Sequence, residues 1–399
     1  MASTAGLGGL KFGPSVMAAQ TNLGGGRTKP AKSTILFFLC GGSSHIDMWD
    51  MKPEAPMEYR GPFRPIKTTA PGVDICEHLP LTAKQGKHLA IVRSVTDFGR
   101  ATGDHHAGYY YNLTGNVPDL TFRTEGNNRR PYATDAPYMG TVIGQRRPKH
   151  PKLPQVITLP TKPSRAPYTR PGQFAGRLGL EHDPFYIYGQ HAKPLNFTAP
   201  SLTLTGGMDG KRLAERKVFL EAINNARRTA DIDPAVVNYT RQQQKAFDLL
   251  SSTETAGAFD IASEPKKVRE RYGEHLNGMS MLMARRLVEA GVPFVTVFWK
   301  VDGINSKLAK KCRSAGGWDT HGDNFNCLKT DLLPRFDQCY SALLEDLAQR
   351  GLLDSTLVML TSEMGRKPKI GDPRSGGTTG GGRDHWTACQ SIVLAGGGI

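Results

Sequence analysis

Histidine and acidic residues gather at five places in this chain, each in a loop next to an apolar segment. The five loops are GGSSHID, TGDHH, GGWDTHGD, TSEMGR and GGRDHW. In open α/β folds the carboxyl ends of the strands meet at one edge of the sheet, where such folds build their sites. Imidazole and carboxylate groups that reach this edge from distant parts of one chain are typical of a metal site.

The strongest pair is Asp319 and His321, two residues apart in GGWDTHGD. An extended backbone points both side chains the same way, as two ligands of one ion require. The alternative is an Asx-turn with an exposed histidine. Asp384 and His385 follow a glycine-rich loop at 371–383, where both can bind metal, or one can bind metal while the other contacts substrate.

Three further acids and imidazoles stand directly after apolar segments. Glu363 follows LVMLT and is either a metal ligand or the ion-pair partner of Arg366. His45 and Asp47 repeat the spacing of two residues, so we expect them to complete the metal's ligands. For His45 the alternative is a loop histidine that binds a backbone carbonyl.

His105 and His106 precede a run of three tyrosines. Either histidine could bind metal, attack a substrate or donate a proton. The chain has no GxSxG elbow, P-loop, GxGxxG fingerprint or HExxH helix. A serine hydrolase, a P-loop NTPase and a Rossmann dehydrogenase are therefore unsupported.

Apolar runs and helical periodicity predict the elements that position these loops. Strands are expected at 34–40, 89–94, 155–159, 294–298, 357–361 and 391–395. Helices are expected at 134–145, 211–229, 234–251, 265–290 and 324–350. This alternation predicts an α/β fold with a largely parallel or mixed sheet and helices on both faces.

The 399 residues carry a formal charge of +15, which favours anionic partners, although a solvated basic surface is the alternative. No basic segment is interleaved with aromatics, so no nucleic acid is expected, and no apolar run is long enough to span a bilayer. Six cysteines form no CxxC pair. A Cys312–Cys327 disulfide is conceivable in an exported protein, and free buried thiols are expected for most of the others.

We divide the chain into a leader at 1–32 and a single domain at 33–399 with an insertion near 160–210. The leader is either the trailing part of an export signal or a disordered segment. The chain stops just after a predicted strand, so the last elements of the fold are expected beyond residue 399.

Several motifs together carry a family resemblance. The segments FFLCGGSSHIDMWDMKPEAP, ARRLVEAGVPFVTV, WDTHGDNF, LLDSTLVMLTSEMGR and GRDHW occur in this order from about Ser33 to the C-terminus. They resemble an uncharacterised sulfatase-like family, domain of unknown function 1501, of the alkaline-phosphatase superfamily. The resemblance implies an alkaline-phosphatase-like α/β/α sandwich. It also implies an exported, periplasmic or extracellular bacterial protein, although the twin-arginine leader frequent in the family is not seen here.

The resemblance also implies roles for residues. Asp319 and His321 resemble the central ligand pair of the superfamily, and Glu363 stands where sulfatases place an Asp. Asp384 and His385 resemble the late acid and histidine contributions.

Two positions depart from the superfamily pattern. Gly41 and Gly42 replace the paired acids that usually end the first strand, so His45 and Asp47 would substitute for them. His105 replaces the Cys or Ser nucleophile of sulfatases, so either His105 or an activated water attacks.

The sequence therefore predicts a metal-dependent hydrolase of sulfate or phosphate esters. One or two divalent ions (Zn, Mn, Mg or Ca) would bind an anionic small molecule or a sulfated glycan, and Arg366 or Arg383 would hold the anion. The alternative is a non-catalytic, metal-stabilised protein that binds polysaccharide at the cell surface.

Overall fold

A seven-stranded mixed sheet forms the centre of the computed structural model, which describes residues 30–165, 167–199, 257–303, 312, 314, 316–371 and 381–399. The strand order across this sheet is β4 (Leu89–Val95), β15 (Gln390–Gly396), β12 (Thr356–Thr361), β1 (Ser33–Phe38), β11 (Phe294–Phe298), β5 (Val156–Leu159) and β8 (Phe185–Tyr186). The five strands from β12 to β8 are parallel, whereas β15 runs antiparallel to both of its neighbours.

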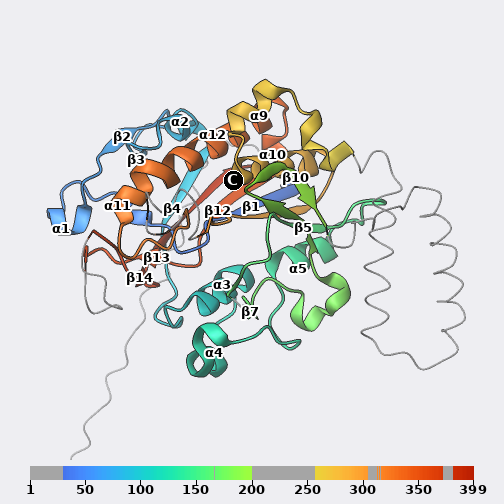
Figure 1. The fold of residues 1–399 in the computed structure, drawn as a ribbon, viewed down its shortest axis with the longest axis horizontal. Coiled ribbons are helices and arrows are strands. Elements are labelled where there is room, and N and C mark those ends of the chain that lie inside the picture. Colours follow the sequence, from blue (N-terminus) through green and yellow to red (C-terminus); the bar gives the residue numbers. More distant parts are fainter. Residues whose placement is uncertain are drawn as a thin grey trace, which may run out of the picture.

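Helices cover both faces of this sheet, as Figure 1 shows. On one face lie α2 (Pro80–Ala83), α9 (Lys266–Tyr272), α10 (Leu276–Glu289) and α12 (Leu333–Gln349). On the other face lie α3 (His105–Thr114), α4 (Leu120–Glu125) and α5 (Met139–Arg146). The predicted three-layer α/β/α sandwich with a mostly parallel sheet is confirmed.

Strand β1 shows why the sequence gives this arrangement. All six of its residues are buried, as expected for a central parallel strand covered on both faces. Phe37 belongs to the core beneath α10 and α12, while Leu36 and Phe38 belong to the core beneath α3. The period of two in a strand therefore supplies both cores from one segment.

The six predicted strands all form. The helix expected at 134–145 begins later, at Met139, and two longer helix predictions also need correction. The helix expected at 265–290 is interrupted by Gly273, whose φ of +80° suits glycine. The His275 side chain then accepts a hydrogen bond from the Gly278 N–H and caps α10. The helix expected at 324–350 forms as α11 (Asn324–Cys327), a π-helical turn (Leu328–Leu332) and α12.

Smaller elements surround the sheet. Two-stranded ladders join β2 (Pro65–Lys67) to β3 (Asp74–Cys76), β6 (Ser164–Arg165) to β7 (Tyr168–Thr169), β9 (Tyr188–Gln190) to β10 (Lys193–Thr198), and β13 (Gly365–Arg366) to β14 (His385–Trp386). A one-turn helix, α1, covers Met57–Arg60. No helix among the described residues has the length and apolar character needed to cross a membrane.

Some predictions lie outside the described residues. These are the helices at 211–229 and 234–251, nearly all of the leader and most of the glycine-rich loop at 371–383. Within the expected insertion near 160–210, the described part contributes β8 to the edge of the central sheet and forms two hairpins. The domain boundaries stay a prediction.

Phe336 on α12 joins the sheet to the loop before Asp319. It is fully buried, and its ring centroid lies 5.8 Å from Phe37 and 5.9 Å from Trp318. We predict that Phe336→Ala lowers the free energy of unfolding by about 3–5 kcal/mol, because it leaves a cavity between these rings. Urea denaturation measures this change.

The matched control is Phe98→Ala, because Phe98 is 77% exposed. This variant should change the free energy of unfolding by less than about 0.5 kcal/mol. Equal losses in the two variants would contradict the assignment of Phe336 to the core.

Candidate metal centre

The candidate site lies where the loops after β1 and β12 meet the loop that carries Asp319. The close approach of these loops depends on Gly41, whose φ is +127°. A Cβ atom at this position would lie 2.3 Å from the backbone nitrogen of Asp319. Glycine thus allows the end of β1 to contact the Asp319 backbone directly.

Three imidazole rings direct their Nε2 atoms at the Asp319 carboxylate. The Nε2 atom of His105 lies 3.3 Å from Oδ2, and those of His321 and His385 lie 2.9 and 3.2 Å from Oδ1. The Nε2 atoms of His321 and His385 are 3.0 Å apart. The predicted residues Asp319, His321, His385 and His105 are therefore brought together.

The opposite nitrogen of each ring has an acceptor. The Nδ1 atom of His105 lies 2.9 Å from Glu363 Oε1, and that of His321 lies 2.5 Å from Asp384 Oδ1. The Nδ1 atom of His385 lies 2.9 Å from the Gly103 carbonyl oxygen. Carboxylate and carbonyl oxygens only accept, so each Nδ1 carries the proton and donates. A ring that is also protonated on Nε2 donates to the Asp319 carboxylate, whereas a ring that has lost this proton presents its Nε2 lone pair to the centre, as a metal ligand does.

This donor set fits a divalent metal ion. Two Nε2 lone pairs 3.0 Å apart repel unless a cation, either a proton or a metal ion, lies between them. Metal ions bind imidazole nitrogen at about 2.0–2.1 Å, which such a pair can accommodate. One ligand atom each from His105, Asp319 and His385 lies within 4.8 Å of the others. Imidazoles whose Nδ1–H groups are held by carboxylate or carbonyl oxygens are typical of metal ligands in proteins.

Glu363 and Asp384, predicted as ligands, contact the Nδ1 atoms of the imidazoles, on the side of the rings away from Asp319. Glu363 is buried and accepts from the Gly41 N–H (2.7 Å) and from His105. Asp384 is also buried and accepts from His321. Both carboxylates therefore orient rings. The group whose ligand atoms all lie within 4.8 Å of one another is His105, Asp319 and His385, and His321 adjoins it through contacts to Asp319 and His385.

Arg366 and Arg383, predicted to hold an anion, are fully buried and bonded to protein groups. Arg366 donates to Asp319 Oδ1 (2.7 Å) and to the carbonyls of Gly41, Gly42, Trp318 and Arg383. Arg383 donates to both oxygens of Asp47 (2.8 and 3.0 Å) and to nearby carbonyls. Arg366 thus fixes the Asp319 carboxylate, and Arg383 fixes Asp47.

His45, Asp47 and His106 are not brought into the group. The His45 ring is buried against Trp386, and burial lowers its pKa to about 3. Asp47 binds Arg383 and accepts from Ser44 and Asn324. The Nδ1 atom of His106 donates to the Arg129 carbonyl oxygen (2.9 Å).

The electrostatics of the centre follow from these contacts. Burial raises the pKa of Asp319, but hydrogen bonds from His105, His321 and His385 outweigh it and hold this pKa well below the usual range. The hydrogen bond to Asp319 raises the pKa of His321. Burial lowers the pKa of His105, but hydrogen bonds to Asp319 and Glu363 outweigh this and raise it overall. Burial lowers the pKa of His385.

Two groups near the centre were missed in the sequence. The Gly103 carbonyl has no side-chain signal that could reveal it. Arg170 stands outside every motif, yet its guanidinium stacks over the Tyr109 ring at 4.8 Å. Its Nη1 atom is buried without a hydrogen-bond partner among the described residues, and its charge helps to lower the pKa of Glu363.

A disulfide closes the loop that carries two of the converging groups. Cys312 and Cys327 are joined, and Asp319 and His321 lie between them. The four other cysteines are free, with Cys76 and Cys339 buried and Cys40 and Cys389 half-buried. The disulfide thus connects this loop to α11 and limits its freedom in the unfolded chain.

Comparison with protein families matches residues 31–399 to the family described as "Protein of unknown function (DUF1501)". A sequence search of curated proteins finds no match.

Solved structures similar to the chain include the PsFucS1 sulfatase from Pseudoalteromonas sp. (13% identity, 93% of this chain and 64% of that chain covered, TM-score 0.40). Ps i-CgsB is 12% identical, with 93% of this chain and 66% of that chain covered and a TM-score of 0.39. The alkaline phosphatase from the Antarctic bacterium TAB5 is 12% identical, with 92% of this chain and 92% of that chain covered and a TM-score of 0.29. The chain spans 64% and 66% of the length of the first two of these proteins.

The pKa directions predict how pH changes the stability of the metal-free protein. The raised pKa values of His105 and His321 give stability that is complete below about pH 6.5 and is lost as pH rises through these raised values. Asp319→Asn removes the charge responsible. The difference in unfolding free energy between wild type and this variant should therefore be larger at pH 6 than at pH 8.5.

Urea denaturation in the presence of EDTA measures this difference. Repeating it with zinc should reverse the trend for the wild type, because metal binding requires neutral imidazoles. A pH-independent difference between wild type and Asp319→Asn would show that the carboxylate does not interact with the rings.

Proposed function

The chain belongs to the DUF1501 family, and from this premise we propose that it is a metal-dependent hydrolase of sulfate or phosphate esters. The observation that carries the proposal is the convergence of three imidazole Nε2 atoms on the Asp319 carboxylate. The side chains of this group are partly open to solvent, from 13% for His105 to 42% for Asp319. Solvent access distinguishes a catalytic metal site from a closed structural one.

The proposed ligands are enough for a single metal ion, and their chemical types indicate which metals would bind. Three imidazoles and one carboxylate suit zinc or manganese better than magnesium or calcium, which prefer oxygen ligands. Bound there, the ion would polarise an ester as a Lewis acid and lower the pKa of a water molecule toward about 7. We assign His105, His321, His385 and Asp319 as its ligands.

The surrounding residues have positioning roles in this proposal. Glu363 and Asp384 keep the protons of His105 and His321 on Nδ1, so that the Nε2 lone pairs stay available. Arg366 fixes the direction of Asp319 through a 2.7 Å hydrogen bond. We place His105 among the metal ligands, which leaves an activated water as the attacking group.

We assign Arg170 as the residue that binds the anionic group of the substrate. The arginines first considered for this role donate to protein acceptors, whereas Arg170 has a buried Nη1 atom without an acceptor among the described residues. Guanidinium groups bind sulfate and phosphate oxygens with charge-assisted hydrogen bonds. The net charge of +15 would also draw an anionic substrate, such as a sulfated glycan, toward the protein.

An exported location belongs to the same proposal. The Cys312–Cys327 disulfide supports it, because disulfides persist in oxidising compartments such as the periplasm or the extracellular space.

We predict that the zinc- or manganese-loaded protein hydrolyses 4-nitrophenyl sulfate, 4-nitrophenyl phosphate or bis(4-nitrophenyl) phosphate. Asp319→Asn and His385→Ala should each lower kcat/KM at least a hundredfold, because each removes a proposed ligand. Chelation by EDTA should abolish turnover, and added zinc or manganese should restore it. His182→Ala is the control, since His182 lies in a surface turn beside Glu181.

The competing function is the non-catalytic, metal-stabilised protein that binds polysaccharide. The burial of Arg366 and Arg383 among protein acceptors favours it over catalysis. Absence of turnover on all three esters, with one metal ion bound per chain and sulfated glycan retained, would establish this function and reject hydrolysis.

Arg170→Ala tests the assignment of the anion-binding residue. Loss of a hydrogen bond from a charged donor costs about 1.5–3 kcal/mol, so KM should rise roughly ten- to a hundredfold while the metal content stays unchanged. Arg130→Ala is the control, because Arg130 is exposed beside Tyr168. An unchanged KM in Arg170→Ala would remove this residue from the site.

A further inference from the structure

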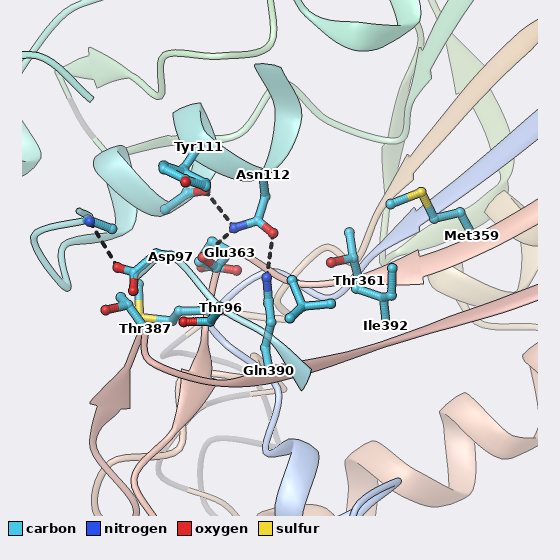
Figure 2. A pocket seen from close by; sticks show the side chains of 14 residues that line it. Thr96, Asp97, Tyr111, Asn112, Met359, Thr361, Glu363, Thr387, Gln390 and Ile392 are labelled. Carbon is cyan, nitrogen blue, oxygen red and sulfur yellow. Dashed lines mark hydrogen bonds between the residues drawn. The ribbon is translucent and has the colours of Figure 1, made fainter. Parts of the chain in front are cut away.

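A cavity of about 210 Å³ lies between α3 and the antiparallel side of the central sheet, outside the group of metal ligands. Figure 2 shows that α3 forms one wall and that β12 and β15 form the other. Its lining includes Val95, Met359 and Ile392 from the strands, Asn112 from α3, and Gln390 at the start of β15. Glu363 connects the two sites, because it belongs to the lining of the cavity and its carboxylate accepts from the His105 ring.

The hydrogen bonds in this cavity fix the orientation of two side-chain amides. Asn112 contacts the carbonyl oxygens of Gly108 (3.0 Å) and Glu363 (2.8 Å) with the same atom. Carbonyl oxygens only accept, so this atom must be the Nδ2 donor, and Oδ1 must face the other way. Oδ1 lies 2.6 Å from the Gln390 amide, which therefore has to present Nε2 to Asn112.

This chain of constraints leaves Gln390 Oε1 as an acceptor without a donor. Gln390 is only 7% exposed, and Oε1 has no hydrogen-bond partner among the described residues. Exchanging the two ends of the Gln390 amide would place two acceptors against each other, so it offers no remedy. Buried acceptors without partners are rare in native proteins, since leaving one unsatisfied is costly.

The lining of the cavity determines which ligand could supply the donor. None of the described residues that line it is Lys or Arg. The Asp97 carboxylate already accepts from the backbone N–H groups of Gly99 and Ala101, at 2.9 Å each. The cavity thus offers no positive group to an anion, and its methionine, valine and isoleucine side chains favour an apolar molecule.

Water alone is a poor occupant of a cavity of this size. Each buried water needs two to four polar partners, which Thr96, Thr361 and Thr387 can supply at one part of the lining, whereas Met359 and Ile392 offer none. An apolar cavity of about 150 Å³ holds benzene, so 210 Å³ accommodates one six-membered ring.

We propose that this cavity binds a small uncharged molecule whose apolar ring or chain packs on Met359 and Ile392 and whose hydroxyl or amide N–H group donates to Gln390 Oε1. The site is distinct from the metal centre. It adjoins that centre through Glu363, whose carbonyl oxygen accepts from Asn112 and whose carboxylate accepts from His105.

Isothermal titration of the full chain with three matched probes tests the proposal. Cyclohexanol carries the donor, methylcyclohexane lacks it, and cyclohexanecarboxylate adds a negative charge. We expect cyclohexanol to bind at least tenfold more tightly than either of the others. Equal binding of cyclohexanol and methylcyclohexane, or absence of cyclohexanol binding, would overturn the proposal.

Two variants locate the binding. Ile392→Trp fills the cavity and should abolish cyclohexanol binding, whereas Leu81→Trp on α2, which covers the opposite face of the sheet, should leave it unchanged. Gln390→Leu removes the acceptor and should weaken cyclohexanol binding at least tenfold without weakening methylcyclohexane binding. Gln390→Leu also decides the outcome if Ile392→Trp fails to fold, with circular dichroism as the check of folding.

A crystal structure of the cyclohexanol-soaked protein completes the test. We expect the hydroxyl group within hydrogen-bond distance of Gln390 Oε1, and ordered water only in the cavity would overturn the proposal. Ester hydrolysis plays no part in these measurements, so they remain decisive even if the protein proves to have no hydrolase activity.

Discussion

Repulsion between imidazole lone pairs is the constraint on which the candidate site depends. Glu363, Asp384 and the Gly103 carbonyl hold the protons of three rings on Nδ1, which turns three Nε2 lone pairs toward one point. Without a cation at this point, the 3.0 Å separation between the Nε2 atoms of His321 and His385 is unfavourable. A proton relieves the repulsion in the metal-free protein, and a metal ion relieves it for all three rings at once.

The fold makes this arrangement rigid. The buried strand β1 pairs in register with β11 and β12, so that the loops after β1 and β12 begin side by side. Gly41 allows the Asp319 backbone to approach the end of β1. Arg366 donates to the Asp319 carboxylate and to the carbonyl oxygens of Gly42 and Trp318, and so holds these two loops together. The same fold leaves the space beneath α3 only partly filled, and Glu363 lies between this cavity and the metal centre.

The strands could be predicted from sequence because continuous apolar runs identify buried strands. The residue types of the site could be predicted as well, and Asp319, His321 and His385 do meet. The contacts of the other acidic residues could not be predicted, because the direction of a side chain after a strand depends on the backbone of the loop. Glu363 and Asp384 thus bind Nδ1 atoms, while Asp47 lies in an ion pair with Arg383. The break at Gly273 was missed because helical periodicity continues across it.

Anomalous diffraction at the zinc edge from zinc-soaked crystals tests the central claim most directly. The account predicts a single strong peak within about 2.0–2.2 Å of the three Nε2 atoms and of one Asp319 oxygen. Zinc bound elsewhere, or no peak between the rings while their Nδ1 hydrogen bonds remain intact, would contradict it.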